Sequence, residues 1–142
     1  MACDPSAPTA PLHAGPILYF DGECGLCNRW VNLLLSADVR GTLRFAPLQG
    51  PTAAERLPPA LVAEVHTLVL EAEGRTLLRS TAVLHALGYL GGIWRLAAVL
   101  RVVPRPLRDA AYDFIARHRF RWFGRLPTCR IPTPAERARF LP

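Results

Sequence analysis

The stretch "YFDGECGLCNRW", residues 19–30, places two cysteines three positions apart, directly after an apolar run and an Asp-Gly turn. The segment "GPILYFD" (15–21) predicts a buried strand that ends at this turn. From residue 25 to about residue 37, apolar residues recur at helical spacing and predict a helix. The inward positions predicted for that helix are Leu26, Trp30, Leu33 and Leu34. Cys24 and Cys27 are therefore expected at a strand-to-helix junction, on the first turn of the helix.

Further strands are predicted after this helix. "TLRFAPLQG" (42–50) predicts a second strand that Pro47 stops, and residues 53–64 predict a short helix started or interrupted by prolines. "VHTLVLEAEGRTLLRS" (65–80) predicts a hairpin closed by a Glu-Gly turn. Because the strands alternate with helices before the hairpin, the fold class is expected to be α/β, a small mixed sheet flanked by helices.

The C-terminal half is predicted to be helical. Ser80 is expected to cap a helix over residues 81–90, which ends near a Gly-Gly pair. Further helices are predicted over 93–103 and 107–123, as a helical extension that caps the sheet. On the last helix, charged residues follow one face at four-residue steps, namely Asp109, Asp113, Arg117 and Arg121.

The two cysteines have the spacing of a redox centre. Unpaired backbone N–H groups and the positive end of the helix dipole should stabilise a thiolate at Cys24 and lower its pKa below about 8.5. Cys24 would then attack a substrate disulfide, and Cys27 would resolve the mixed disulfide. Asp21 is either a proton acceptor for the resolving thiol or the cap of the helix. The charges of Asp21 and Glu23 should also raise the thiol pKa, which predicts a moderately reducing pair.

Other interpretations of the pair compete with this one. Zinc would need four ligands, and beyond the CxxC the sequence offers Cys129, His118 and scattered others. A buried, inert pair is a second possibility, because reactive cysteines need an accessible, electropositive site. Cys129 could relay a disulfide to the pair or be simply buried. No cofactor is expected.

Two further segments can be interpreted either as structural features or as binding sites. The N–H groups at Ser80 and Thr81 could bind a carboxylate, such as that of a glutathione-like thiol, or only be capped. "RHRFRWFGR" (117–125) interleaves arginine with aromatic residues, which suits nucleic acid or acidic lipid as well as arginine stems that cover a core edge. All 17 basic residues are arginine and the net charge is +6, so arginine is enriched throughout and a nucleic-acid partner is not expected.

The whole chain has 142 residues, which suits one domain over 16–142 after a flexible, Pro/Ala-rich arm over 1–15. The start lacks the pattern of a secretory signal, which predicts a cytoplasmic protein. The most apolar long stretch, 84–104, contains a histidine and two arginines before its final proline, so no transmembrane segment is expected.

Several segments together resemble the DCC family of thiol-disulfide oxidoreductases, whose motif has an aspartate and two cysteines spaced as in "DGECGLC". The resemblance covers about residues 16–141 and includes the segments "FAPLQ" (45–49), "RSTAVLHAL" (79–87), "VPRPLRDAAYDFIARHRFRWFGR" (103–125) and "CRIPTPAERARF" (129–140). It implies a thioredoxin-like fold with Asp21, Cys24 and Cys27 as the defining residues.

One feature departs from thioredoxins and glutaredoxins, which carry a proline just before the strand that faces the CxxC. "AEVHTLVL" (63–70) has none, so substrate docking beside Cys24 is expected to differ. The sequence thus predicts an enzyme that exchanges disulfides with a protein or a small thiol compound. The alternative is a non-catalytic module, either zinc-bound through the CxxC or an Arg-rich adaptor. The sequence does not identify the reductant.

Overall fold

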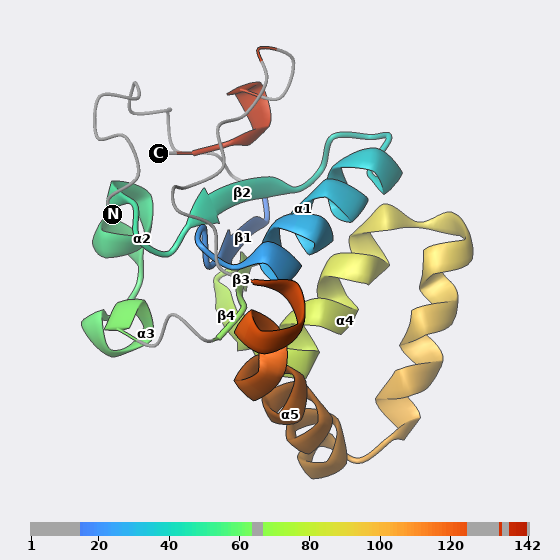
Figure 1. Cartoon of the computed structure of the whole chain (residues 1–142). Coiled ribbons are helices and arrows are strands. Elements are labelled where there is room, and N and C mark those ends of the chain that lie inside the picture. Colours follow the sequence, from blue (N-terminus) through green and yellow to red (C-terminus); the bar gives the residue numbers. More distant parts are fainter. Residues whose placement is uncertain (1–14, 64–66, 125–133, 135–136, 142) are drawn as a thin grey trace.

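A computed structural model describes residues 15–63, 67–124, 134 and 137–141 of the chain. A four-stranded sheet lies at its centre, with strand order β2-β1-β3-β4 (Figure 1). β1 pairs in parallel with β2, whereas β1–β3 and β3–β4 are antiparallel. The strands are β1 (Ile17–Phe20), β2 (Arg44–Pro47), β3 (Val69–Ala72) and β4 (Arg75–Leu78). The expected small mixed α/β sheet is confirmed, and it is consistent with a thioredoxin-like fold.

Helices flank the sheet, and the C-terminal ones pack on the other helices. Figure 1 shows α1 and α4 together beside the sheet, with α2 and α3 away from them. α5 packs against α1 and α4, so the C-terminal helical extension is confirmed. The helices are α1 (Gly25–Ala37), α2 (Pro51–Arg56), α3 (Pro59–Ala63), α4 (Arg79–Leu90), the 3₁₀ helix η1 (Gly92–Val102), α5 (Arg105–Phe123) and the 3₁₀ turn η2 (Arg137–Arg139).

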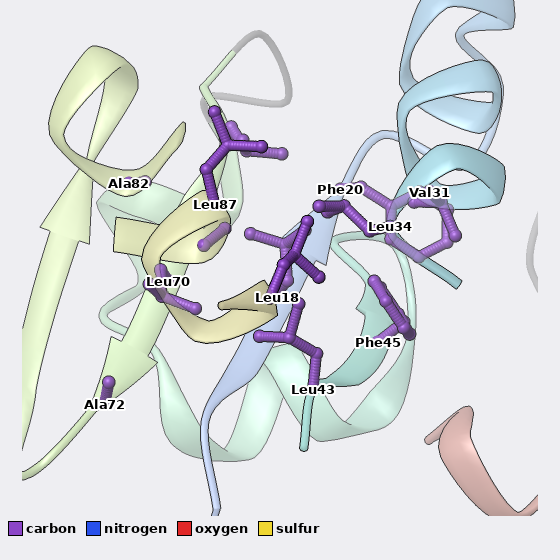
Figure 2. Packing of buried hydrophobic residues seen from close by; sticks show 13 residues of the cluster. Leu18, Phe20, Val31, Leu34, Leu43, Phe45, Leu70, Ala72, Ala82 and Leu87 are labelled. Atoms are coloured by element: carbon purple, nitrogen blue, oxygen red, sulfur yellow. The ribbon is translucent and has the colours of Figure 1, made fainter. Parts of the chain in front are cut away.

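The two faces of the sheet bury two separate hydrophobic clusters, because side chains alternate along each strand. On one face, residues from three strands meet α1 and α4 (Figure 2); they include Leu18, Phe20, Phe45, Leu70, Val31, Leu34, Ala82 and Leu87. The other face packs mainly against α2 and includes Ile17, Tyr19, Val69, Ala53 and Leu57. Each large side chain that is fully buried stabilises the fold by about 1.5–3 kcal/mol. β1 is buried on both faces, which fixes the strand that leads into the cysteine motif.

The predicted turns are found where the sequence placed them. Glu73 and Gly74 both have positive φ, 51° and 73°, as a tight hairpin between β3 and β4 requires. The predicted helix over 53–64 consists of two short helices, because Leu57 adopts an extended backbone (ψ 150°) before Pro58. Part of the segment before β3, residues 64–66, lies outside the described residues.

Three helical predictions need correction. Leu33 is 40% exposed, and the buried residues of α1 are Gly25, Asn28, Val31 and Leu34, so its inward stripe is rotated from the predicted one. α4 begins at Arg79, with Leu78 as its N-cap, so Ser80 lies inside the first turn instead of capping the helix. The helix predicted over 93–103 is η1, a 3₁₀ helix with no buried residue.

Candidate active site

Cys24 itself caps α1, at the point where β1 leads into the helix. Its backbone is extended, and its Sγ accepts a hydrogen bond from the Cys27 backbone N–H at 3.4 Å. The turn before it is closed by the Cys24 N–H, which donates to the Asp21 carbonyl at 3.2 Å. A sulfur therefore occupies the place where serine, threonine or aspartate oxygens usually bind the first N–H groups of a helix. The role of Asp21 as the helix cap is thus wrong.

The two sulfurs have opposite acidities. The hydrogen bond from the Cys27 thiol, the backbone N–H groups of Cys27 and Leu26 and the charge of Arg119 together lower the pKa of Cys24 to about 6, against the opposing effect of burial. The pKa of Cys27 is raised well above its ordinary value, because its proton is held by Cys24 and because it is buried. At neutral pH the pair accordingly holds a thiolate at Cys24 and a thiol at Cys27. Both residues are free cysteines; Cys24 is buried, with 0% of its surface exposed, and Cys27 is partly exposed. A substrate disulfide can therefore reach the Cys24 sulfur only if neighbouring groups move.

Asp21 is buried behind the pair as part of an ion pair. Its side chain and that of Arg119 are each 3% exposed, and Arg119 Nη2 lies 3.0 Å from Asp21 Oδ2. The other oxygen, Oδ1, accepts hydrogen bonds from the Glu23 N–H at 3.0 Å and from Gln49 Nε2 at 2.7 Å. Gln49 in turn accepts a hydrogen bond from the Gly22 N–H at 3.2 Å. The carboxylate is thus held by groups from three parts of the chain.

This environment changes the expected effect of the acidic residues. The charge of Asp21 raises the pKa of Cys27, whereas Arg119 acts in the opposite direction on both cysteines. The predicted lowering of the Cys24 pKa is thus found, and the predicted raising effect of Asp21 acts on Cys27. A buried positive charge that pairs with Asp21 had not been anticipated from the sequence.

Arg119 is the site residue that sequence reasoning missed. Its Nη1 lies 3.8 Å from Cys27 Sγ, and its guanidinium carbon lies 4.4 Å from the Phe120 ring centroid. The sequence offered one signal. Tyr112, Ala116, Arg119 and Phe123 follow each other at steps of four, three and four, so this arginine lies within the inward stripe of α5. In a chain rich in arginine, that position alone did not separate it from the exposed ones.

A glycine allows α5 to reach the cysteines. The Gly25 N–H donates a hydrogen bond to the Gly124 carbonyl at 3.2 Å, and a Cβ on Gly25 would collide with the Phe123 carbonyl oxygen. Figure 1 shows the end of α5 beside the start of α1. The turn is held further by Asn28, whose Nδ2 donates to the carbonyls of Gly22 and Cys24 at 3.1 and 2.9 Å. Gly25 thus makes room for the C-terminal end of the helix that carries Arg119.

The chain that enters β3 lies near the pair and is held by a tyrosine. The Leu68 N–H donates to the Tyr112 hydroxyl at 2.7 Å. Burial raises the pKa of Tyr112 to about 12, and the nearby sulfur of Cys27 contributes to this rise. Thr67 is buried, and no cis peptide bond occurs among the described residues. Just before β3, where the sequence has no proline, the backbone N–H of Leu68 is thus bound by a side chain.

The start of α4 was a possible binding site for a substrate carboxylate, but the carboxylate found there is that of Asp109. The Ser80 hydroxyl donates to Asp109 Oδ1 at 2.5 Å. The pKa of Asp109 is lowered mainly by this hydrogen bond, with a smaller contribution from the Ser80 backbone N–H. Asp109 comes from α5, so this contact joins two helices, and the first N–H groups of α4 already have an internal anion.

Two other candidate residues are His118 and Cys129. His118 Nδ1 lies 2.8 Å from the Phe114 carbonyl, and its ring stacks on Trp122. Cys129 lies outside the described residues. Within the described part of the chain, no three His, Cys, Asp or Glu side chains gather in a group suited to a metal ion. The same part contains no helix with both the length and the hydropathy of a membrane span.

Comparisons with known proteins match a long segment of the chain that includes the cysteine motif. Residues 18–125 match the family described as DCC1-like thiol-disulfide oxidoreductase. The chain is 36% identical over 128 residues to the uncharacterised protein YuxK of Bacillus subtilis (strain 168), covering 89% of this chain and 93% of that one. It is 32% identical over 119 residues to a chloroplastic DCC family protein of Arabidopsis thaliana, covering 82% of this chain and 69% of that one. No solved structure gives a significant match.

Proposed function

Because the chain belongs to the DCC1-like thiol-disulfide oxidoreductase family, we propose that it reduces disulfides of proteins or small thiol compounds through Cys24 and Cys27. Cys24 is the attacking sulfur and Cys27 the resolving one. Asp21 and Arg119 are positioning residues, because they act on the substrate only through the two sulfurs. The single observation that carries the proposal is the Cys24 sulfur at the N-cap of α1, with its pKa lowered to about 6.

In the first step the Cys24 thiolate attacks one sulfur of a substrate disulfide. A bond forms between Cys24 Sγ and that sulfur, and the substrate S–S bond breaks. The other substrate sulfur leaves as a thiolate and takes a proton from water. A pKa of about 6 keeps most of Cys24 ionised at neutral pH, so the attack needs no separate base.

In the second step Cys27 attacks Cys24 Sγ and releases the remaining substrate thiol. Cys27 must first lose its proton to water, which the neighbouring Cys24 thiolate opposes in the free enzyme, and the departing substrate sulfur takes a proton from water. Once Cys24 is part of a mixed disulfide, that negative charge is gone. Arg119, 3.8 Å from Cys27 Sγ, then stabilises the Cys27 thiolate. The products are two substrate thiols and a Cys24–Cys27 disulfide.

The cycle closes when an external thiol reductant returns two electrons to the Cys24–Cys27 disulfide. Such a reductant belongs to a reducing compartment, and we place the protein in the cytoplasm. Residues 16–142 are taken as one domain, since the described cysteine site joins the turn before α1, the turn after β2 and α5 through Asp21, Gln49 and Arg119. Both oxygens of Asp21 are occupied by the ion pair with Arg119 and by two hydrogen bonds, so in this scheme Asp21 holds Arg119 in place and is not used as a base.

The test compares wild type with Cys24→Ser and Cys27→Ser in reduction of a protein disulfide such as that of insulin. Cys24→Ser should abolish turnover, whereas Cys27→Ser should accumulate the mixed disulfide. Turnover that survives Cys24→Ser would reject the assignment. If Cys24→Ser accumulated the mixed disulfide instead, the two roles would have to be exchanged.

A further inference from the structure

We propose that the exposed faces of η1 and α5, two elements that each pack on α4, dock on an anionic lipid bilayer. The surface, called here the η1–α5 surface, consists of large apolar side chains that the fold leaves exposed. They are Ile93, Leu96, Val99, Leu100 and Val102 on η1, and Leu107, Phe114, Ile115 and Trp122 on α5. These make up nine of the eleven large apolar side chains exposed in the described part of the chain, so the exposure is concentrated in these two elements.

α5 is apolar on two faces, and the fold uses only one. The face that carries Tyr112 and Arg119 packs inward against the cysteine site. A second stripe follows steps of four, three, four and four residues: Leu107, Ala111, Phe114, His118 and Trp122. Phe114 and Trp122 are 55% and 52% exposed. The rings of this stripe contact one another: Phe114 and His118 are tilted by 39° with centroids 4.6 Å apart, and His118 stacks on Trp122 with centroids 5.1 Å apart.

The charge around this surface is predominantly positive. Between residues 74 and 124 the only acidic residues are Asp109 and Asp113. Asp109 accepts a hydrogen bond from Ser80, and Asp113 lies 3.5 Å from Arg79. The exposed charges on η1 and α5 are arginines, namely Arg95, Arg101, Arg105, Arg117 and Arg121. Arginines beside exposed apolar and tryptophan side chains complement the anionic head groups and the acyl boundary of a bilayer.

The composition favours a bilayer over a protein or a second copy of the chain. Residues 92–124 contain no serine, threonine, asparagine or glutamine. A protein interface carries about one hydrogen bond per 100–200 Å², and this surface has few neutral polar side chains to supply them. A symmetric dimer through the same surface would bring five exposed arginines toward their copies, with Asp113 as the one acid on these two elements that is more than a third exposed. A bilayer needs only apolar side chains and cations, and both are present.

The test is cosedimentation of the full chain with vesicles of equimolar phosphatidylglycerol and phosphatidylcholine, and with vesicles of phosphatidylcholine alone. We expect binding to the anionic vesicles that falls with added salt, and much weaker binding to the neutral ones. Arg117→Gln with Arg121→Gln should weaken binding about 25-fold, at about fivefold (about 1 kcal/mol) for each arginine near the surface. Phe114→Ser with Ile115→Ser on α5, and Ile93→Ser with Leu96→Ser on η1, should each weaken it at least as much.

The matched control is Val39→Ser, because Val39 is 89% exposed but lies in the turn after α1. It should bind like wild type, and so should Cys24→Ser, since docking does not depend on the thiol chemistry. All variants are compared at equal helical circular dichroism, and the reduced Arg117→Gln/Arg121→Gln variant should keep the wild-type rate of disulfide exchange. Absence of binding to anionic vesicles, binding that survives both serine pairs, or a wild-type dimer that those pairs dissociate would each overturn the proposal.

Discussion

Replacement of Arg119 by methionine should slow the resolving step more than the attacking step. Arg119 Nη1 lies 3.8 Å from Cys27 Sγ, and both partners of its ion pair with Asp21 are 3% exposed. At an effective dielectric constant of about 20, a unit charge at that distance stabilises a thiolate by up to about 4 kcal/mol, or about 3 pKa units. In the mixed disulfide, the pKa of Cys27 should rise by up to that amount. Arg119→Lys, which keeps the charge, should restore part of the rate.

The assay is stopped-flow reaction with an aromatic disulfide whose released thiolate absorbs visible light. Cys24 attack releases the first thiolate and Cys27 resolution the second, so the two steps are seen in one trace. In Arg119→Met the second phase should be about 10- to 1,000-fold slower at neutral pH and should recover as the pH rises. The first phase should slow less, because at Cys24 the charge of Arg119 matters less than the hydrogen bonds from Cys27 and burial.

Two controls separate this electrostatic role from folding. Arg117→Met removes an exposed arginine two residues away on the same helix and should leave both phases unchanged. Removal of one partner from a buried ion pair costs about 3–5 kcal/mol of stability, so Arg119→Met is paired with Asp21→Asn/Arg119→Met, which leaves no buried charge unpaired. If both folded variants kept the wild-type pH profile of the second phase, the assigned role of Arg119 would be wrong.

Three further predictions follow from the same contacts. Gly25→Ala should lower the free energy of unfolding by about 1–3 kcal/mol in chemical denaturation, because its Cβ would meet the Phe123 carbonyl, whereas Gly88→Ala has open space and should not destabilise; equal effects would contradict the close approach of α5. Tyr112→Phe should cost about 1–3 kcal/mol by leaving the Leu68 N–H unpaired, and a neutral effect would show that water replaces the hydroxyl. In the reduced protein, the lowered pKa of Cys24 stabilises the folded state at pH values above the pKa that Cys24 has in the unfolded chain, and this contribution is lost as the pH falls toward 6. The free energy of unfolding should therefore rise between about pH 6 and 9 in wild type and rise less in Cys24→Ser. Parallel curves for the two proteins would refute this.

Local patterns predicted the part of the site that is continuous in sequence. The run from Ile17 to Ala37 contains its own strand, turn and helix signals, so the placement of Cys24 and Cys27 followed from adjacent residues. The hairpin was equally local, since Glu73 and Gly74 determine it. The family resemblance added the thioredoxin-like fold, with which the sheet order is consistent.

Contacts between distant segments could not be predicted in this way. The Asp21–Arg119 pair joins residues 98 positions apart, and nothing near Arg119 in sequence indicates that α5 ends at the start of α1. The same holds for Ser80, whose expected capping role is replaced by a hydrogen bond to Asp109 on another helix. The buried stripe of α1 is displaced from Leu33 for a similar reason, because α1 packs against both α4 and α5. In each case tertiary packing overrode a local signal.

The most direct test of the central claim is the pH titration of the Cys24 thiolate by its ultraviolet absorbance in the reduced protein. Wild type should show one thiolate forming with a midpoint at about 6, and Cys24→Ser should lack this step. A midpoint at or above about 8.5, the value of an unperturbed cysteine, would contradict the account. So would a low step that remains when Cys24 is replaced.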